Sequence, residues 1–319
     1  MLNFIGKVFL LLILLLPNHL LKAVNYDFVV APDGSGDYSS IQQAIDACKA
    51  FPDSRVHIYV KNGTYKEKVL VPSCNSHLTI TGQSAEATII TWDDYFDKIN
   101  RGRNSTFYTY TLKIEADDFV LENITVENSA GPVGQAVALH VEGNQCVFHN
   151  CRFLGFQDTV YAAGQMSRML FSKCYIEGTT DFIFGQATVW FDNCRIHCKS
   201  DSYITAASTP EGNPFGFVFK NCKLSAAQDV SKLFLGRPWR NYARVAFLNC
   251  EMGTFVLPQG WDNWNKPDAE KTTFFAEYKS IGAGASPRQR VIWSHQFSDS
   301  EAAAITPETV LGTWAAAYQ

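Results

Sequence analysis

The chain has 319 residues, of which 46% are hydrophobic and 18% are charged, and its formal net charge is −4. This is the composition of an ordinary globular protein that can bury a large core. The negative charge argues against nucleic acid as a partner, because bulk electrostatics would not draw such a chain to phosphates.

The first 23 residues have the features of a secretory signal peptide. Lys7 gives a basic start, the run "VFLLLILLLP" is too short to span a membrane, and "LKA" ends on Ala23, a small residue suited to cleavage. A membrane anchor is the less favoured alternative. We therefore expect a secreted protein, extracellular or, in a Gram-negative bacterium, periplasmic, with no stable membrane insertion after the signal is removed. The net charge would then be −6, because two lysines and no acid are lost.

A short amphipathic helix is predicted near the start of the mature chain. In "SSIQQAIDACK", Ser39 and Gln42 form a candidate capping box. Ile41, Ile45 and Cys48 recur at helical spacing and predict an apolar stripe. We expect this helix to cover one end of the repeats that follow.

One short phrase recurs along the middle of the chain. It alternates apolar and polar residues, as a half-buried strand does, and turn-forming residues follow it. The copies are "VLENITV" from Val120, "VFHNCRF" from Val147, "LFSKCYI" from Leu170, "WFDNCRI" from Trp190, "VFKNCKL" from Val218 and "AFLNCEM" from Ala246. They are spaced 20 to 28 residues apart, with no long helical stretch between them. Self-similarity at this period predicts an all-β parallel β-helix with one such strand per coil.

The repeats also account for most of the nine cysteines. Five share one position of the phrase and are expected to form an inward-facing stack: Cys151, Cys174, Cys194, Cys222 and Cys250. The asparagines before four of them are expected to form a polar ladder: Asn150, Asn193, Asn221 and Asn249. Because adjacent coils lie about 4.8 Å apart, one cysteine pair could also be disulfide-bonded in an oxidising compartment. No CxxC or HExxH spacing occurs, so we expect no metal site.

The chain after the last repeat predicts short helices. Ser298 with Glu301 is a second candidate capping box, and Pro307 follows Thr306 at a typical helix start. A solenoid needs both ends covered, so we expect these helices to close the C-terminal end. Residues 24–319 would then form one domain.

Two aspartates fall at the same position on neighbouring coils. Asp158 and Asp181 each lie seven residues after the cysteine of their phrase, and counting back 23 residues from Asp158 reaches Gln135. Two carboxylates that stand one coil apart cannot both ionise freely, so the pair can supply an acid and a nucleophile or base. The alternative is that each aspartate only caps a turn, which is how we interpret Asp201, the next residue of the extrapolated column.

The stretch "LFLGRPWR" adds a permanent cation, Arg237, and an aromatic face, Trp239. An arginine beside a carboxylate keeps it ionised and oriented, and an exposed tryptophan suits stacking on a sugar ring. Alone this signal is weak, because Gly-Arg-Pro is also a good turn.

Five sequence boxes resemble those of the pectin methylesterase (pectinesterase) family, in the family's order. They are "GTYKE" (Gly63–Glu67), "QAVAL" (Gln135–Leu139), "GFQDTV" (Gly155–Val160), "DFIFG" (Asp181–Gly185) and "LGRPW" (Leu235–Trp239). Their one departure is Val160, where family members usually have Leu. The resemblance runs from about Phe28 to Trp293 and implies a right-handed parallel β-helix. It also implies hydrolysis of C6 methyl esters of galacturonate in pectin (homogalacturonan) to the free acid and methanol.

The resemblance implies roles for individual residues. Asp181 would be the nucleophile, Asp158 the general acid and base, and Gln135 and Gln157 the groups that hold the oxyanion. Arg237 would hydrogen-bond the nucleophile. Residues that match the family's sugar-binding cleft are Thr106, Tyr161, Phe184 and Trp239.

The family's chemistry requires neither a metal nor an organic cofactor, and its partner is pectin; we expect a monomer. The resemblance also matches Cys174 and Cys194 to a disulfide pair of some plant members. Two other classes of protein stay open. A β-helix lyase or galacturonase would cut the polysaccharide backbone, but it needs a Ca²⁺ cluster or carboxylates placed across a glycosidic bond. A non-catalytic carbohydrate-binding β-helix would keep the aromatic residues without a column of Gln and Asp.

Overall fold

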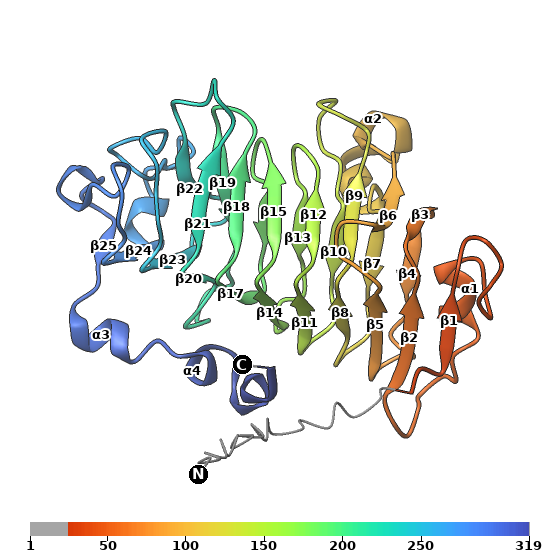
Figure 1. Ribbon diagram of the computed structural model, residues 1–319. Coiled ribbons are helices and arrows are strands. Elements are labelled where there is room, and N and C mark those ends of the chain that lie inside the picture. The colour runs from red at the N-terminus through yellow and green to blue at the C-terminus, as the bar shows by residue number, and fades with distance from the viewer. Residues whose placement is uncertain (1–24, 319) are drawn as a thin grey trace, which may run out of the picture.

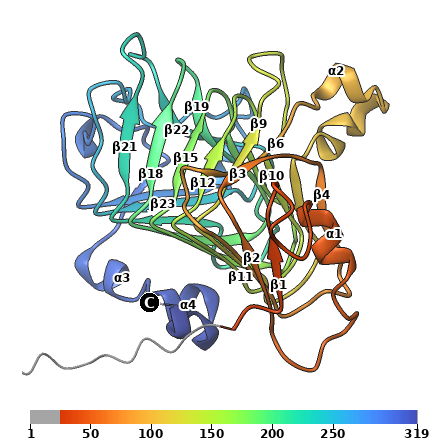
Figure 2. The ribbon, with the colours of Figure 1, turned by 45° about the vertical axis from the view of Figure 1, so that its right-hand side comes forward.

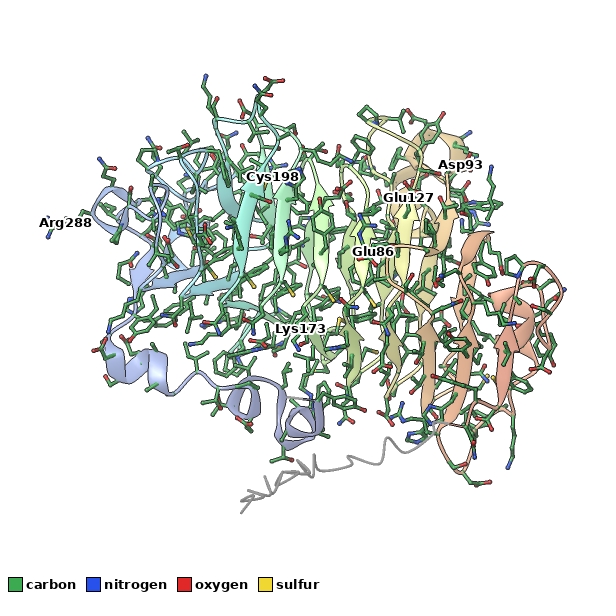
Figure 3. The ribbon with its side chains drawn as sticks, viewed as in Figure 1. Glu86, Asp93, Glu127, Lys173, Cys198 and Arg288 are labelled. Carbon is green, nitrogen blue, oxygen red and sulfur yellow. The ribbon has the colours of Figure 1, made fainter. Side chains whose placement is uncertain are left out.

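The computed structural model describes residues 25–318, which form a right-handed parallel β-helix. Three sheets of eleven, seven and seven strands run along the solenoid, and neighbouring strands in them are parallel. Successive coils stack side by side along the axis (Figure 1), and the turned view shows the three sheets around a common interior (Figure 2). Side chains fill that interior (Figure 3). The fold predicted from the repeats is confirmed.

The strands are named by sheet. Sheet A contains β1 (Phe28–Val30), β2 (Val56–Val60), β5 (Leu78–Gly82), β8 (Val120–Glu122), β11 (Cys146–His149), β14 (Arg168–Ser172), β17 (Thr188–Asp192), β20 (Phe217–Lys220), β23 (Arg244–Leu248), β24 (Phe274–Tyr278) and β25 (His295–Gln296). Sheet B contains β3 (Gly63–Lys66), β6 (Thr88–Trp92), β9 (Thr125–Asn128), β12 (Arg152–Leu154), β15 (Tyr175–Gly178), β18 (Arg195–Cys198) and β21 (Lys223–Ala226). Sheet C contains β4 (Val69–Val71), β7 (Leu112–Ile114), β10 (Leu139–Val141), β13 (Val160–Ala162), β16 (Ile183–Gly185), β19 (Tyr203–Ala207) and β22 (Phe234–Pro238).

The helices are short and lie outside the coils. The α-helices are α1 (Ile41–Asp46), α2 (Phe96–Ile99), α3 (Asp299–Ala303) and α4 (Pro307–Leu311). The 3-10 helices are η1 (Gly102–Tyr108), η2 (Ala269–Lys271), η3 (Pro287–Gln289) and η4 (Thr313–Tyr318).

The asparagine of the repeated phrase turns the chain from sheet A into sheet B. Its φ lies between +50° and +55° in five coils, in the left-handed region that Asn tolerates better than most residues. The predicted polar ladder is wrong as a continuous feature. Among the described residues no two of the four predicted asparagines hydrogen-bond to each other: Asn150 Nδ2 donates to Asn123 Oδ1 at 2.7 Å, and Asn193 donates to the neighbouring Asp192.

The five repeated cysteines face inward, as predicted, and are buried. Each thiol donates to a main-chain carbonyl of the preceding coil, as Cys174 Sγ does to Phe148 O at 3.3 Å. All nine cysteines are free thiols, so Cys174 and Cys194, which the resemblance matched to a disulfide, are not bonded to each other. Phenylalanine rings stack in the same interior, with adjacent centroids from Phe148 to Phe247 separated by 4.3 to 5.0 Å.

The N-terminal helix forms where it was predicted, but its cap differs. α1 packs against β1 and β4, and its N-cap is Ser40 rather than Ser39. The carboxylate of Glu67, from the "GTYKE" box, accepts hydrogen bonds from Ile41 N at 2.9 Å, Gln42 N at 3.1 Å and Ser40 Oγ at 2.7 Å. A carboxylate from the loop between β3 and β4 therefore satisfies the first turn in place of a local capping box.

Both C-terminal helix starts are confirmed, with a capping box at Ser298 and Glu301 and with Pro307 in the first turn of α4. Their place differs from the expected closure of the end. α4 packs against β14 and β17, so the segment runs back beneath sheet A (Figure 1). The reason is an apolar row on the outer face of sheet A that needs cover: Val120, Val147, Leu170, Trp190, Val218 and Ala246.

The predicted signal peptide, residues 1–23, lies outside the described residues. Within residues 25–318, no helix is both long enough and apolar enough to cross a membrane.

Candidate active site

Asp158 and Asp181 stand in register on neighbouring coils of sheet C. Each lies two residues before its strand, and β13 pairs with β16 so that Val160 faces Ile183. Both aspartates have a positive φ, +67° and +50°, and are 8% and 6% exposed. The amide of each donates to the next coil, Asp158 N to Thr180 O and Asp181 N to Tyr203 O. The backbone therefore holds both carboxyl groups at one level of the sheet.

Arg237 reaches Asp181 from β22, two strands along sheet C. Its Nε donates to Oδ1 at 2.9 Å and its Nη2 to Oδ2 at 2.7 Å, so the contact is bidentate. The guanidinium carbon lies 4.0 Å from the ring centroid of Tyr203 and 3.7 Å from that of Trp264. Two aromatic faces and a fork of two charge-assisted hydrogen bonds therefore fix Arg237 and orient the Asp181 carboxylate.

Burial raises the pKa of both carboxyl groups, and the two differ in what counteracts this rise. Burial raises the pKa of Asp181, and the hydrogen bonds and charge of Arg237 work against that rise. Burial and the nearby charge of Asp181 raise the pKa of Asp158 well above its ordinary value. Within the described residues, the Asp158 carboxyl has no hydrogen-bond partner. Over a range of pH the site therefore holds an ionised Asp181 beside a protonated Asp158.

Gln135 and Gln157 lie beside the aspartates, but not in the column that was extrapolated. Gln135 bridges to Gln157, so its neighbour on the next coil is Gln157 rather than Asp158. Their side-chain amides make no hydrogen bond to another described residue, and both line the same cavity as the aspartates. Each can therefore donate to a bound group.

Asp201 is a turn residue, as interpreted from the sequence. It is exposed, and its Oδ1 accepts hydrogen bonds from Ser231 N at 2.7 Å and Lys232 N at 2.8 Å. The position equivalent to Asp181 on the next coil belongs to Tyr203, because Ile183 pairs with Thr205.

The cavity at the aspartates has a volume of about 310 Å³. Of the predicted binding residues, Thr106, Phe184 and Trp239 line it directly. Tyr161 lies behind Phe184, with the two rings stacked at 4.5 Å, and Trp239 is 5.8 Å from Phe184. The structure thus gathers the five predicted catalytic residues and the predicted cleft residues at one place.

Five residues that line the cavity were missed from the sequence: Ala206 on β19, and Phe96, Arg103, Phe107 and Trp264. The last four come from the segment of α2 and η1 and from the loop after Trp261, which carry no repeat. Register arguments cannot place such loops, and the available signal was only that aromatic residues occur in them.

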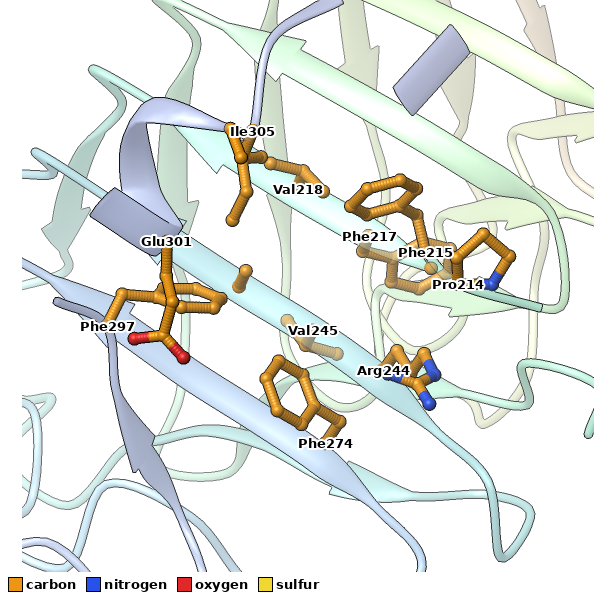
Figure 4. A pocket seen from close by; sticks show the side chains of 13 residues that line it. Pro214, Phe215, Phe217, Val218, Arg244, Val245, Phe274, Phe297, Glu301 and Ile305 are labelled. Atoms are coloured by element: carbon orange, nitrogen blue, oxygen red, sulfur yellow. The ribbon is translucent and has the colours of Figure 1, made fainter. Parts of the chain in front are cut away.

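A second cavity of about 310 Å³ lies between sheet A and α3 (Figure 4). Its walls are apolar, with Val218, Val245 and Ile305 among them. The charged groups at its edge are Arg244 and Glu301, and Glu301 is already engaged in the capping box of α3. This cavity has the same size as the first but holds no pair of titratable groups facing each other.

Comparison with known proteins decides the family. The Pectinesterase family model matches residues 27–313. The chain belongs to the pectinesterase family. It is 39% identical to Pectinesterase 31 of Arabidopsis thaliana over 281 residues, which cover 86% of this chain and 88% of that protein. Pectinesterases are carboxylic ester hydrolases, and this chain is an enzyme of that class.

Solved structures of the family share the fold. The pectin methylesterase from carrot matches with a TM-score of 0.86 and 32% identity, covering 93% of this chain and 97% of that one. A pectin methylesterase in complex with a hexasaccharide matches with a TM-score of 0.78 and 27% identity, covering 92% and 98% of the two chains.

Proposed function

We propose that this pectinesterase hydrolyses C6 methyl esters of galacturonate residues in pectin with Asp181 as the nucleophile. The proposal rests on Asp181, whose carboxylate is held by Arg237 at 2.7 and 2.9 Å beside a second buried carboxyl group, at a cavity with aromatic walls. The aromatic faces suit sugar rings, and a hexasaccharide is bound in a structure of the family.

The first half of the reaction forms an acyl-enzyme. A carboxylate oxygen of Asp181 attacks the C6 carbonyl carbon, and the electron pair of the carbonyl moves onto its oxygen. The side-chain amides of Gln135 and Gln157 donate hydrogen bonds to this oxyanion. When the intermediate collapses, the bond from C6 to the methoxy oxygen breaks and Asp158 donates its proton to that oxygen. Methanol leaves, and C6 is joined to Asp181 as a mixed anhydride.

The second half releases the product. Asp158, now a carboxylate, accepts a proton from water, and the hydroxide formed attacks C6. Collapse breaks the bond to Asp181, which leaves as a carboxylate, and the galacturonate acid is free. Asp158 has now replaced the proton that it gave to methanol, and the catalytic cycle is complete. None of these steps needs a metal or an organic cofactor, and we predict that the enzyme uses neither.

The pKa order of the aspartates supports this division. A nucleophile must be ionised and a leaving-group acid protonated at the same pH, and Arg237 and burial favour these states for Asp181 and Asp158 respectively. Thr106, Tyr161, Phe184 and Trp239 would hold the sugar rings of the substrate.

The test is methanol release from highly esterified pectin, with the viscosity of the same solution followed in parallel. We expect methanol at constant viscosity, because the backbone is not cut. A falling viscosity would indicate a lyase or galacturonase, and binding without methanol would indicate a non-catalytic carbohydrate-binding protein.

We also propose that residues 1–23 direct secretion and that the mature enzyme acts as a monomer on cell-wall pectin, outside the cell or in a periplasm. The N-terminal sequence of the secreted protein would test the first point, and light scattering the second. A retained N-terminus or a dimer would contradict them.

A further inference from the structure

An outward-facing row of three basic residues and one tyrosine crosses sheet B, away from the active site. Arg152 pairs with Tyr175, Tyr175 with Arg195 and Arg195 with Lys223, so the four stand at one level on successive coils. The residues after them face the core: Phe153, Ile176, Ile196 and Leu224. At about 4.8 Å per coil, the row is about 14 Å long.

The turn beside this row departs from the repeat. Five coils place an asparagine at the left-handed turn between sheets A and B: Asn123, Asn150, Asn193, Asn221 and Asn249. The coil that carries Tyr175 has Lys173 there instead, with a φ of +55°, and the coil after Asn249 has Lys279, with a φ of +42°. Lysine is less suited than asparagine to this backbone conformation. The conformation of the turn therefore gives no reason for a lysine at position 173.

The two arginines of the row and the adjacent Lys173 have no counter-charge in the part of the chain that the structure describes. Among residues 25–318, no carboxylate pairs with Arg152, Arg195 or Lys173. The two guanidinium carbons lie 5.5 and 5.8 Å from the ring centroid of Tyr175, which therefore orients both. Lys223, at the end of the row, differs, because Glu251 Oε1 lies 2.9 Å from its Nζ.

Arg152, Lys173, Tyr175 and Arg195 line a polar groove of about 470 Å³, and Lys223 lies outside it. Glu86 is the one acidic residue among the described groups that line it, against the three unpaired cations. Figure 3 shows Lys173 and Glu86 on the face that sheet B presents to the viewer. The nearby Glu177 is occupied, since Lys199 Nζ lies 2.9 Å from its Oε1 and the Tyr175 hydroxyl donates to its Oε2. The groove is therefore locally basic on an acidic protein.

The groove and the active site are on different sheets. Sheet B carries the basic row and sheet C carries the two aspartates and Arg237. One ligand can therefore occupy the groove while another occupies the cleft.

We propose that the row of Arg152, Tyr175, Arg195 and the adjacent Lys173 is a second binding site for de-esterified galacturonan, the anionic product of the reaction. This inference rests on the proposed function, because that reaction makes a linear polymer with one carboxylate on each sugar. The two guanidinium groups stand two coils apart, about 10 Å, and such a spaced pair suits carboxylates repeated along a chain. Binding there keeps the enzyme near polymer that it has already processed, while the cleft on sheet C takes remaining esters.

Other polyanions fit less well. Phosphate-rich polymers are bound through many cations and a positive overall field, whereas this chain has a net charge of −4 and three unpaired cations in the groove. We therefore assign the groove to a carboxylated polysaccharide and not to nucleic acid.

The test uses fully de-esterified polygalacturonate, which has no ester to hydrolyse, and calorimetric titration at low ionic strength. The variant is Arg152→Gln with Arg195→Gln, which keeps most of each side chain over Tyr175 and removes both charges. The matched control removes two charges elsewhere, with Lys61→Gln and Arg288→Gln, near opposite ends of the solenoid. We expect at least tenfold weaker binding for the groove variant and a change below twofold for the control.

A second variant, Lys173→Asn, places at this turn the residue that five other coils have there. We expect a loss of binding of about threefold with no loss of thermal stability. Because this change returns the turn to its common form, it tests the groove without disturbing the fold.

Polygalacturonate binding that is equal in the wild type and both groove variants would overturn the proposal. Equally tight binding of duplex DNA, lost in the same variants, would show a general polyanion site and overturn the polysaccharide assignment. Methanol release from a short, fully methylated oligogalacturonide is measured alongside and is expected to be unchanged in the groove variants. Failure of the wild type in that assay would contradict the proposed function, whereas the titration would still report on the groove.

Discussion

Within residues 25–318, the protein buries two pairs of carboxylate and arginine, and it holds them differently. Glu277 on β24 accepts hydrogen bonds from Arg290 Nε at 2.7 Å and Nη2 at 3.0 Å. The guanidinium also donates to three main-chain carbonyl oxygens, those of Leu257, Pro258 and Gly284. Every hydrogen-bonding edge of this pair faces protein, so it can only hold the last coils together.

Asp181 and Arg237 make the same fork, but the pair borders a cavity and lies beside the Asp158 carboxyl, which has no hydrogen bond within the described residues. A buried ion pair is therefore not by itself a sign of catalysis. A second, unsatisfied titratable group and a space for substrate give the Asp181 pair its chemistry.

The largest expected effect is the loss of turnover in Asp181→Asn, by about 10⁴-fold or more, as when a nucleophile is removed. The amide has nearly the size of the carboxylate but cannot form the acyl-enzyme, so folding and pectin binding should persist. The measurement is kcat for methanol release. The matched change at the other pair, Glu277→Gln, should leave kcat unchanged, and activity of Asp181→Asn within tenfold of the parent would remove Asp181 from the nucleophile role.

The second prediction concerns the Glu277 pair. Arg290→Ala leaves Glu277 buried without its partner and should lower the free energy of unfolding by about 3–5 kcal/mol. Urea denaturation measures this. Since Arg237 borders the cavity, where water can reach Asp181, Arg237→Ala should cost clearly less stability. Equal losses would mean that both pairs are structural.

The third prediction is that Gln135→Ala lowers kcat by about 10²-fold to 10³-fold, the usual effect of losing one oxyanion donor. Gln157→Ala is the matched variant and should behave similarly, because both amides face the cavity. Steady-state kinetics on esterified pectin separate the two parameters. A rise in KM with kcat unchanged would make Gln135 a ground-state binder.

The smallest effect is a shift in the pH profile of kcat/KM. Activity should rise as Asp181 loses its proton and fall as Asp158 loses its own, giving a bell. Arg237→Ala removes the group that opposes the raised pKa of Asp181, so the acidic limb should move to higher pH. Arg237→Lys restores the charge without the fork and should recover part of the activity. An acidic limb that does not move in Arg237→Ala would limit Arg237 to substrate binding.

The sequence predicted the middle coils well because six of them repeat a strand, a turn and an inward apolar residue, which is cysteine in five and Ile124 in the first. It placed Asp158 level with Asp181 because equivalent positions on these two coils are 23 residues apart. The paired residues Val160 and Ile183 have the same separation. The same spacing failed one coil earlier, where Leu139 pairs with Val160, 21 residues on. Loops of different length separate the strands, so one spacing cannot be carried along the whole solenoid.

Other features could not be predicted because they depend on contacts between distant segments. Glu67 caps α1 from the loop between β3 and β4, and Trp264 reaches Arg237 from a loop outside the repeats. The five family boxes predicted the contact between Arg237 and Asp181. Nothing in the sequence indicated that Trp264 would pack against Arg237.

The division of roles between the aspartates can be measured directly by ¹³C NMR of protein labelled at the aspartate carboxyl carbons. Asp158→Asn and Asp181→Asn assign the two signals by their disappearance. We predict that Asp158 keeps its proton to higher pH than Asp181. In Asp181→Asn the pKa of Asp158 should fall, because the charge of Asp181 is gone, yet stay above its ordinary value, because burial remains. If Asp181 instead keeps its proton to the higher pH, it cannot be the ionised nucleophile beside a protonated Asp158.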